Sequence, residues 1–303
     1  MLHGERLIRF FEHRDGHFAA AKVIGKVVEL NEEALAQVAG GDADGVKPLD
    51  ALEHLFDVEL AVAPDAYRRL LPPSTRAAAQ PRLRLLAASI GRNALSPVGY
   101  NEVWLMAPVV FEGEEVWFAL SHLVSPGGDV ITGRETFGWP TKMAEQIVIR
   151  RLGSALDLSI VRLHRQVLAG RARLAGRPGA GREERLTVLG VQPIGSPIEG
   201  ADSRYVTQPW AVEFARVSRV DPRSVTLGFP AGRSPGLIGR SDAWHQFAGA
   251  PVMSASFGRG TIRRYPGAVR SAGLRPDIIP YLSDRNDAYA GQQPIDSSFL
   301  VRT

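Results

Sequence analysis

The chain has 303 residues, of which 45% are hydrophobic and 22% are charged. These values are typical of globular proteins and exclude disorder as the main state. The absence of cysteine excludes disulfides, thiolate nucleophiles and metal sites with cysteine ligands. The net charge is +4, and the 36 basic residues are spread among 32 acidic ones with no basic run. We therefore expect a mixed, solvated surface and no nucleic-acid partner.

The sequence also indicates where the protein resides. No stretch approaches the roughly 20 consecutive apolar residues that a membrane span needs. Charged residues interrupt the apolar ones throughout the first segment, MLHGERLIRFFEHRDGHF, which is not the pattern of a secretory signal. We expect a cytoplasmic protein with no membrane association.

Residues 1–50 are interpreted as an N-terminal extension packed on the main domain. An apolar segment at 18–30 and a helix-like segment at 31–39 precede a Gly/Asp-rich loop. The main domain is expected to span 51–283, and the polar residues 284–303 to form a C-terminal tail that wraps the surface or a neighbouring subunit.

Within the main domain, residues 56–63 alternate apolar and polar side chains as a half-buried strand does. Pro64 and Asp65 then open a short helix, which a Pro-Pro pair closes. Residues 100–124 are rich in β-branched and aromatic residues around a turn-like Glu112-Gly113-Glu114, which predicts a hairpin of two buried strands.

Further short strands are predicted at 155–163, 166–174, 210–220 and 224–229, with a flexible loop at 175–185. No long window has a clear helical period. The pattern therefore favours a mostly antiparallel sheet or barrel with a few peripheral helices, in the α+β class, over a doubly wound fold.

Common catalytic motifs are missing from the sequence. There is no Gly-rich phosphate loop, GxSxG elbow, HExxH or kinase signature. His13 and His17 are spaced for one helix face, but Asp15-Gly16 between them disfavours a helix. We expect no metal site.

One lysine stands out in the segment GRETFGWPTKMA, residues 133–144. The chain has four lysines, and Lys142 is the only one after Lys47. A lysine differs from arginine chiefly in that it can lose its proton and act as an amine nucleophile. Phe137, Trp139 and Met143 can exclude water around it, and such desolvation lowers the pKa of an ammonium group.

This segment resembles the acetoacetate decarboxylase family, whose members carry GRE, an aromatic residue, a proline and two adjacent lysines. The resemblance is clear from about residue 55 to 150. It implies a barrel-like α+β domain, a homo-oligomer, and a Schiff base between a lysine and a keto acid with no metal or organic cofactor. On this basis Lys142 is the candidate nucleophile, and Arg134 and Trp139 belong to the substrate cavity.

A second match lies in the predicted hairpin. The family places a glutamate after an aromatic residue there, and Tyr100-Asn101-Glu102 lies at the matching distance from the lysine position. The resemblance thus implies that Glu102 is the acid/base partner, with Tyr100 and His122 in the cavity.

The sequence also departs from the family pattern. Thr141 occupies the position of the family's Schiff-base lysine, and Lys142 that of its neighbour. Adjacent side chains of a strand point to opposite faces, so Lys142 is expected to point away from the cavity if Thr141 points into it. The family's substrate-binding arginine is missing at Leu52-Glu53-His54-Leu55; Arg259, Arg263 and Arg264 are candidates to replace it.

Three hypotheses follow. The first is a Schiff-base lyase that acts on a keto acid or related carbonyl compound by decarboxylation, aldol chemistry or dehydration, with Lys142 and Glu102. The second keeps the scaffold without an imine, and Glu102, Thr141 and His122 or His245 transfer protons in an isomerase, hydratase or cyclase reaction. The third is a non-catalytic small-molecule binder, its cavity lined by Trp104, Trp117, Trp139 and Trp244.

Overall fold

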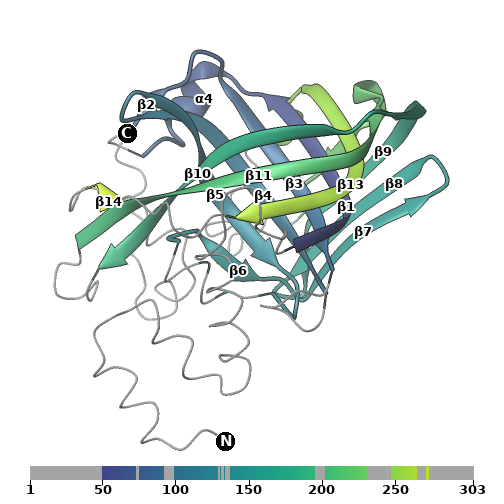
Figure 1. Cartoon of the computed structure of the whole chain (residues 1–303), viewed down its shortest axis with the longest axis horizontal. Helices are drawn as coiled ribbons and strands as arrows, with labels where there is room; N and C mark the ends of the chain where they lie inside the picture. The colour runs from purple at the N-terminus through teal and green to yellow at the C-terminus, as the bar shows by residue number, and fades with distance from the viewer. Residues whose placement is uncertain are drawn as a thin grey trace, which may run out of the picture.

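The computed structural model describes residues 50–72, 75–91, 99–128, 130, 133, 137–194, 202–230, 244, 247–264 and 271–272. Its main feature is a seven-stranded barrel in the order β10-β5-β4-β3-β1-β13-β11, closed where β11 pairs with β10 (Figure 1). The barrel strands are β1 (Asp50–Ala61), β3 (Arg82–Ile90), β4 (Tyr100–Phe111), β5 (Glu114–Val124), β10 (Arg182–Ile194), β11 (Asp202–Val220) and β13 (Val252–Arg264). The neighbours are antiparallel except β10 and β5, which run parallel. The predicted fold class is confirmed, and the barrel is mixed.

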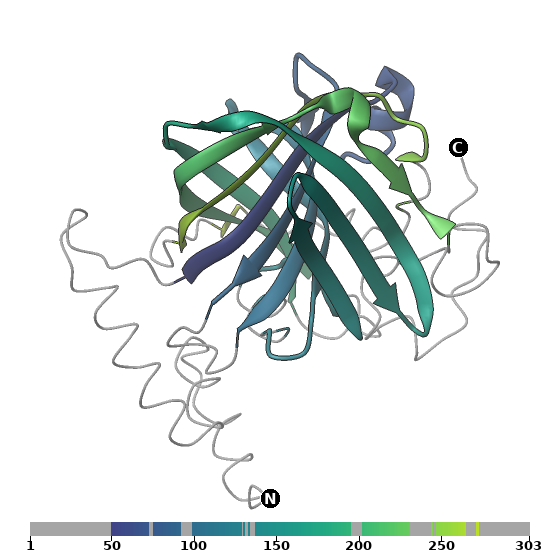
Figure 2. The same ribbon diagram turned by 90° about the vertical axis from the view of Figure 1, so that its right-hand side faces the viewer.

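The sheet continues beyond the barrel. From β11 it extends through β9 (Arg165–Gly179), β8 (Ala155–Arg162) and β7 (Gln146–Leu152), which project from one side of the barrel (Figures 1 and 2). Short strands pair with the longer ones: β2 (Arg76–Ala77), β6 (Thr141–Met143), β12 (Thr226–Gly228) and β14 (Ser271–Ala272). The described helices are short, α4 (Pro64–Arg68) and the 3-10 turn η3 (Pro222–Ser224).

Local sequence signals account for several of these elements. The predicted hairpin is β4 and β5, and its turn is formed by Glu112 and Gly113, whose φ angles of 52° and 93° suit a two-residue hairpin turn. The helix α4 begins at Pro64, as expected from a proline in the first turn. The strand predicted from residue 56 begins earlier, at Asp50, and ends at Ala61.

One local prediction is wrong. The expected loop at 175–185 is largely strand, because β9 continues to Gly179 and β10 begins at Arg182. The end of β9 pairs with Val217–Val220 of β11, which holds this Gly- and Arg-rich stretch extended. The predicted extension at 1–50, apart from the first residue of β1, and the predicted tail at 284–303 lie outside the described residues. Within the described ranges, no helix has the length and apolar character to cross a membrane.

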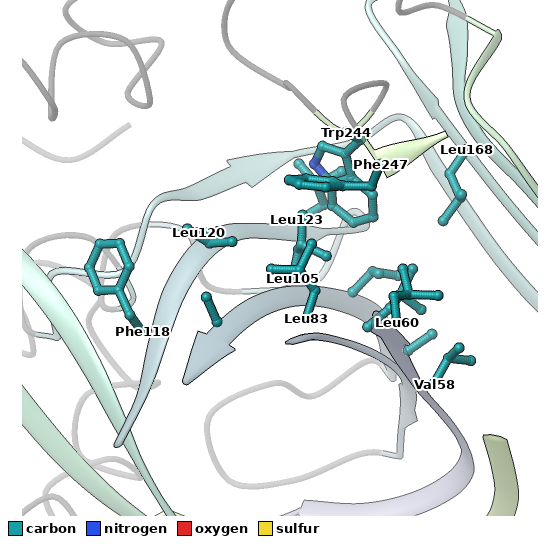
Figure 3. Packing of buried hydrophobic residues seen from close by; sticks show 14 of the residues in the cluster. Val58, Leu60, Leu83, Leu105, Phe118, Leu120, Leu123, Leu168, Trp244 and Phe247 are labelled. Carbon is teal, nitrogen blue, oxygen red and sulfur yellow. The ribbon is translucent and has the colours of Figure 1, made fainter. Parts of the chain in front are cut away.

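The buried residues form two apolar clusters on opposite faces of the barrel wall. The inner cluster includes Leu86, Trp104, Val188, Trp210 and Ile262 and draws on all seven barrel strands, so it fills the barrel interior. The outer cluster lies between the wall and strands β7–β9. In Figure 3, side chains of neighbouring strands line up in this outer cluster, including Leu60, Leu83, Leu105 and Leu123, and Trp244 and Phe247 pack over them.

Ion pairs between Arg84 and its neighbours Asp57 and Glu184 fill part of the barrel interior. The Arg84 guanidinium is buried and makes two hydrogen bonds to Asp57, each 2.9 Å, and two to Glu184, at 2.6 and 2.7 Å. Arg182 donates a third hydrogen bond to Asp57, at 3.2 Å. Burial alone would lower the pKa of Arg84, but the two carboxylates outweigh it and raise the pKa. The pairs tie β1, β3 and β10 together.

Candidate functional site

A second cluster of polar side chains lies inside the barrel, apart from the ion pairs of Arg84. It consists of three buried residues, Glu102 on β4, His122 on β5 and Thr141 on β6, and of the partly buried Arg264 at the end of β13. The sheet register explains how three of them meet, because His122 pairs with Trp104 of β4 on one side and with Thr141 of β6 on the other. Glu102 is two residues from Trp104 and therefore points to the same face.

The four side chains form a continuous chain of polar contacts. The Thr141 Oγ1 lies 2.8 Å from Nδ1 of His122, and Nε2 of His122 lies 3.3 Å from Oε2 of Glu102. The other carboxylate oxygen of Glu102 accepts a hydrogen bond from the Arg264 guanidinium. Glu102, His122 and Thr141 are at most 2% exposed, so bulk water does not screen these contacts.

Burial and neighbouring charges determine the protonation states of Glu102 and His122 near neutral pH. Burial alone would raise the pKa of Glu102, but the Arg264 charge and the His122 hydrogen bond outweigh it and lower the pKa to about 2. Burial lowers the pKa of His122 from its ordinary 6.5, and the raising effect of Glu102 does not cancel it. Glu102 is therefore ionised, His122 is neutral, and the charges of Glu102 and Arg264 balance.

Three tryptophans enclose the polar group. Trp104 stacks on the His122 ring with 3.5 Å between centroids, and Trp139 meets the same ring edge-on at 5.7 Å. The Arg264 guanidinium lies 4.9 Å from the ring centre of Trp210, within cation–π range. The indole N–H of Trp139 is buried and has no hydrogen-bond partner among the described residues. It is a donor available to an acceptor on a bound molecule.

Backbone contacts set the position of Thr141. The Trp139 N–H donates to the Gly133 carbonyl at 2.9 Å, and the Val191 N–H of β10 donates to the Gly138 carbonyl at 2.8 Å. A side chain at Gly133 would strike the Thr141 hydroxyl oxygen, so only glycine permits this close approach. The segment that leads into β6 is thus held against β10 and β5.

Lys142 is also buried, with 4% of its surface exposed. It pairs in β6 with Leu123, whose side chain belongs to the outer cluster, whereas Thr141 pairs with His122. Because successive side chains of a strand alternate, that of Lys142 leaves β6 on the face opposite to Thr141. The register of β6 thus sets Thr141 beside His122 and Lys142 beside Leu123.

The other residues predicted from sequence are dispersed. Tyr100 begins β4 and packs against the inner cluster. Trp117 lies beside Arg82 and Arg84 at the ion pairs, and Trp244 donates to Ser121 at 3.0 Å within the outer cluster. Arg134 and His245 lie outside the described residues.

Of the arginines proposed as replacements, Arg259 is exposed and Arg263 lies 4.0 Å from Glu213, whereas Arg264 reaches Glu102. The sequence did not identify Arg264 as the partner of Glu102, nor Trp210 as part of the site. Arg264 lies two residues after the buried Ile262, so strand alternation places both side chains on the inner face of the barrel. This alternation was the sequence feature from which Arg264 could have been predicted. In the described part of the chain, no group of three or more His, Asp or Glu side chains could hold a metal ion.

Comparisons with known proteins agree with the barrel. The family model described as Acetoacetate decarboxylase (ADC) matches residues 47–216, which is more than half of the chain. A search of curated proteins found no match.

Among solved structures, acetoacetate decarboxylase from Legionella pneumophila subsp. pneumophila str. Philadelphia 1 is similar with a TM-score of 0.61 and 14% identity, over 75% of this chain and 88% of that one. An acetoacetate decarboxylase-like enzyme from Sphingomonas wittichii RW1 has a TM-score of 0.57 and 15% identity, over 75% and 92%. The enduracididine biosynthesis enzyme MppR, complexed with the condensation product of pyruvate and imidazole 4-carboxaldehyde, has a TM-score of 0.50 and 16% identity, over 76% and 89%. At these identities the structures show a shared fold, and with the family model covering more than half of the sequence, the chain belongs to the acetoacetate decarboxylase family.

Proposed function

We propose that this chain is an enzyme that acts on a small keto acid or related carbonyl compound by proton transfer beside the carbonyl group, without an imine. The observation that carries the proposal is the buried chain of contacts from Thr141 through His122 and Glu102 to Arg264. Membership of a family of enzymes supports a catalytic role over a simple binding role. The titratable groups with lowered pKa values support it further.

His122 is the proton acceptor in this proposal. It is neutral near pH 7, and the Glu102 carboxylate stabilises the imidazolium that forms when it takes a proton. The Thr141 hydroxyl ends the chain and passes the proton between substrate and His122. The Trp139 indole N–H, which has no partner among the described residues, binds the carbonyl oxygen as negative charge develops on it.

Removal of a proton beside a carbonyl yields an enolate. Protonation of a conjugated enolate at its far carbon completes an isomerase reaction. Loss of hydroxide from the carbon next to the deprotonated one completes a dehydratase reaction, in which the enzyme acts as a carbon–oxygen lyase. Enzymes named in the comparisons act on keto acids, and MppR is named with pyruvate and a condensation product of it. That chemistry is the reason to choose keto acids as the first substrates.

The second candidate is a Schiff base on Lys142. Its support is the burial of Lys142 in the segment that resembles the family motif, because a desolvated lysine is the form that attacks a carbonyl. Against it stands the register of β6, which pairs Thr141 with His122 and Lys142 with Leu123, so that the hydroxyl of Thr141 is the group in contact with His122. Decarboxylase or aldolase chemistry belongs to this candidate.

The test measures exchange of the protons beside the carbonyl. A panel of pyruvate, 2-oxobutanoate, acetoacetate and acetone is incubated with the protein in D2O and followed by proton NMR. We expect exchange in the unmodified chain and in Lys142→Met, and a loss of about 100-fold or more in Glu102→Gln and His122→Gln. In parallel, samples are treated with borohydride and their masses are measured. A reduced adduct on Lys142, with exchange lost in Lys142→Met, would replace the proposal by the Schiff-base candidate.

The cytoplasmic location, the homo-oligomeric state and the small-molecule partner stay predictions from the sequence. Gel filtration with light scattering measures the oligomeric state directly.

A further inference from the structure

The protonation of His122 can be read from its neighbours. Glu102 is ionised, so its Oε2 can only accept a hydrogen bond. The proton of neutral His122 therefore lies on Nε2, where it is donated to Glu102. The other ring nitrogen, Nδ1, is left as an acceptor and receives the hydroxyl hydrogen of Thr141 across 2.8 Å. A hydroxyl thus faces a basic nitrogen whose ring a carboxylate orients.

This is the order of groups that activates a hydroxyl nucleophile: alcohol, imidazole and carboxylate in sequence. Arg264 fixes the carboxylate, and the stacked Trp104 ring holds the imidazole plane, so neither group is free to turn away from Thr141. On the side of Gly133 the backbone lies close against the Thr141 hydroxyl oxygen, which helps to hold the hydroxyl in place beside His122.

We propose that Thr141 is a nucleophile and that this site transfers acyl groups from small, uncharged esters to water. The activity goes beyond proton transfer on keto acids, although it uses the same His122 and Glu102. Two observations set the substrate class. Glu102 and Arg264 carry opposite charges, so this pair does not call for a charged acyl group, and Thr141 has no exposed surface, which limits the acyl group to the smallest ones.

The reaction balances with water as the co-reactant. As Oγ1 of Thr141 bonds to the acyl carbon, its proton moves to Nδ1 of His122 and the carbonyl π electrons move to oxygen. That electron pair re-forms the carbonyl, and the bond to the leaving alkoxide breaks; the alkoxide takes the proton from His122. Water then adds to the Thr141 ester with His122 as base, releases the carboxylic acid, and restores the hydroxyl.

The experiment uses p-nitrophenyl acetate and the full-length chain. Release of nitrophenolate is followed by stopped flow, and acid-quenched samples are digested so that the acetyl group is located by peptide mass. We expect a burst of nitrophenolate and one acetyl group on Thr141. In Thr141→Val we expect no acetyl group at residue 141 and a burst rate lower by about 100-fold or more. Thr207→Val removes the hydroxyl of another buried threonine, on β11, and keeps the burst.

Further variants keep the outcomes unambiguous. Thr141→Ser retains a hydroxyl and is expected to be acetylated, which a merely structural role of Thr141 would not require. His122→Gln is expected to abolish the burst. Three results would overturn the proposal. They are acetylation of Lys142 alone, a burst that persists in Thr141→Val, and the absence of any acetyl-enzyme in a sample that urea unfolding shows to be folded. Proton exchange on the keto acids is measured in the same preparations, so failure of this inference is distinguished from failure of the proposed function.

Discussion

The Thr141 hydroxyl contacts Nδ1 of His122 at 2.8 Å although the two residues are 19 positions apart in the chain. The contact exists because β6 adds to β5 as a short parallel strand in the register that sets His122 beside Thr141. A shift of that register by one residue would place Lys142 there instead. The chemistry of this site therefore depends on the register of a three-residue strand.

Acid stability tests the charge of Glu102. Its pKa in the folded chain is about 2, below the ordinary value of 4.5, so the stabilising effect is complete above about pH 4.5 and is lost as the pH falls towards 2. We expect the free energy of unfolding of the unmodified chain, measured in urea, to fall as the pH is lowered through this window. Glu102→Gln is expected to lack this part of the pH dependence. Glu114→Gln, at the exposed start of β5, is the matched control and should follow the unmodified chain.

The pH dependence of proton exchange tests His122. Burial lowers the pKa of His122 in the folded chain, so the neutral base persists below pH 6.5. We expect the exchange rate on an active keto acid to stay level from pH 7.5 to 6.5 and to fall only at lower pH. A midpoint of the acid limb above 6.5 contradicts this assignment. NMR titration of the His122 ring gives an independent reading.

The buried ion pairs of Arg84 make a prediction on stability. Arg84→Met leaves Asp57 and Glu184 without their shared guanidinium, and loss of one partner of a buried pair costs about 3 to 5 kcal/mol. Urea unfolding of Arg84→Met, Asp57→Asn and the double variant measures the coupling, and we expect the double variant to lose less than the sum of the two. Arg68→Met removes only an exposed pair with Asp65 and should change little.

Gly133 offers a test of space beside Thr141. Gly133→Ala places a methyl group against the Thr141 hydroxyl, and such overpacking costs about 1 to 3 kcal/mol. We expect the protein to remain folded and its proton-exchange rate to fall, because the hydroxyl is pushed out of line with His122. Gly228→Ala, whose new methyl group meets only an ordinary contact with the Ala169 carbonyl, is the control. Equal activity of the two variants would show that the hydroxyl position does not matter.

Sequence patterns predicted the strands well where local signals were strong. The alternation before Pro64 and the Glu112-Gly113 turn marked β1, α4 and the β4–β5 hairpin correctly. The stretch 175–185 was misread because its glycines and arginines resemble a loop, and only pairing with β11 makes it strand. Local composition carries no information on a partner 40 residues away.

By itself the sequence indicated the family and the β-rich class, and it nominated Glu102, Thr141 and the segment before Lys142 as candidates, because these depend on motifs and alternation along one stretch of chain. Only the tertiary structure decided which residues meet. Arg264 reaches Glu102 from 162 positions away, and Trp210 covers that arginine from another strand. Barrel closure and strand register bring such residues together, and both result from pairing between distant segments rather than from any local pattern.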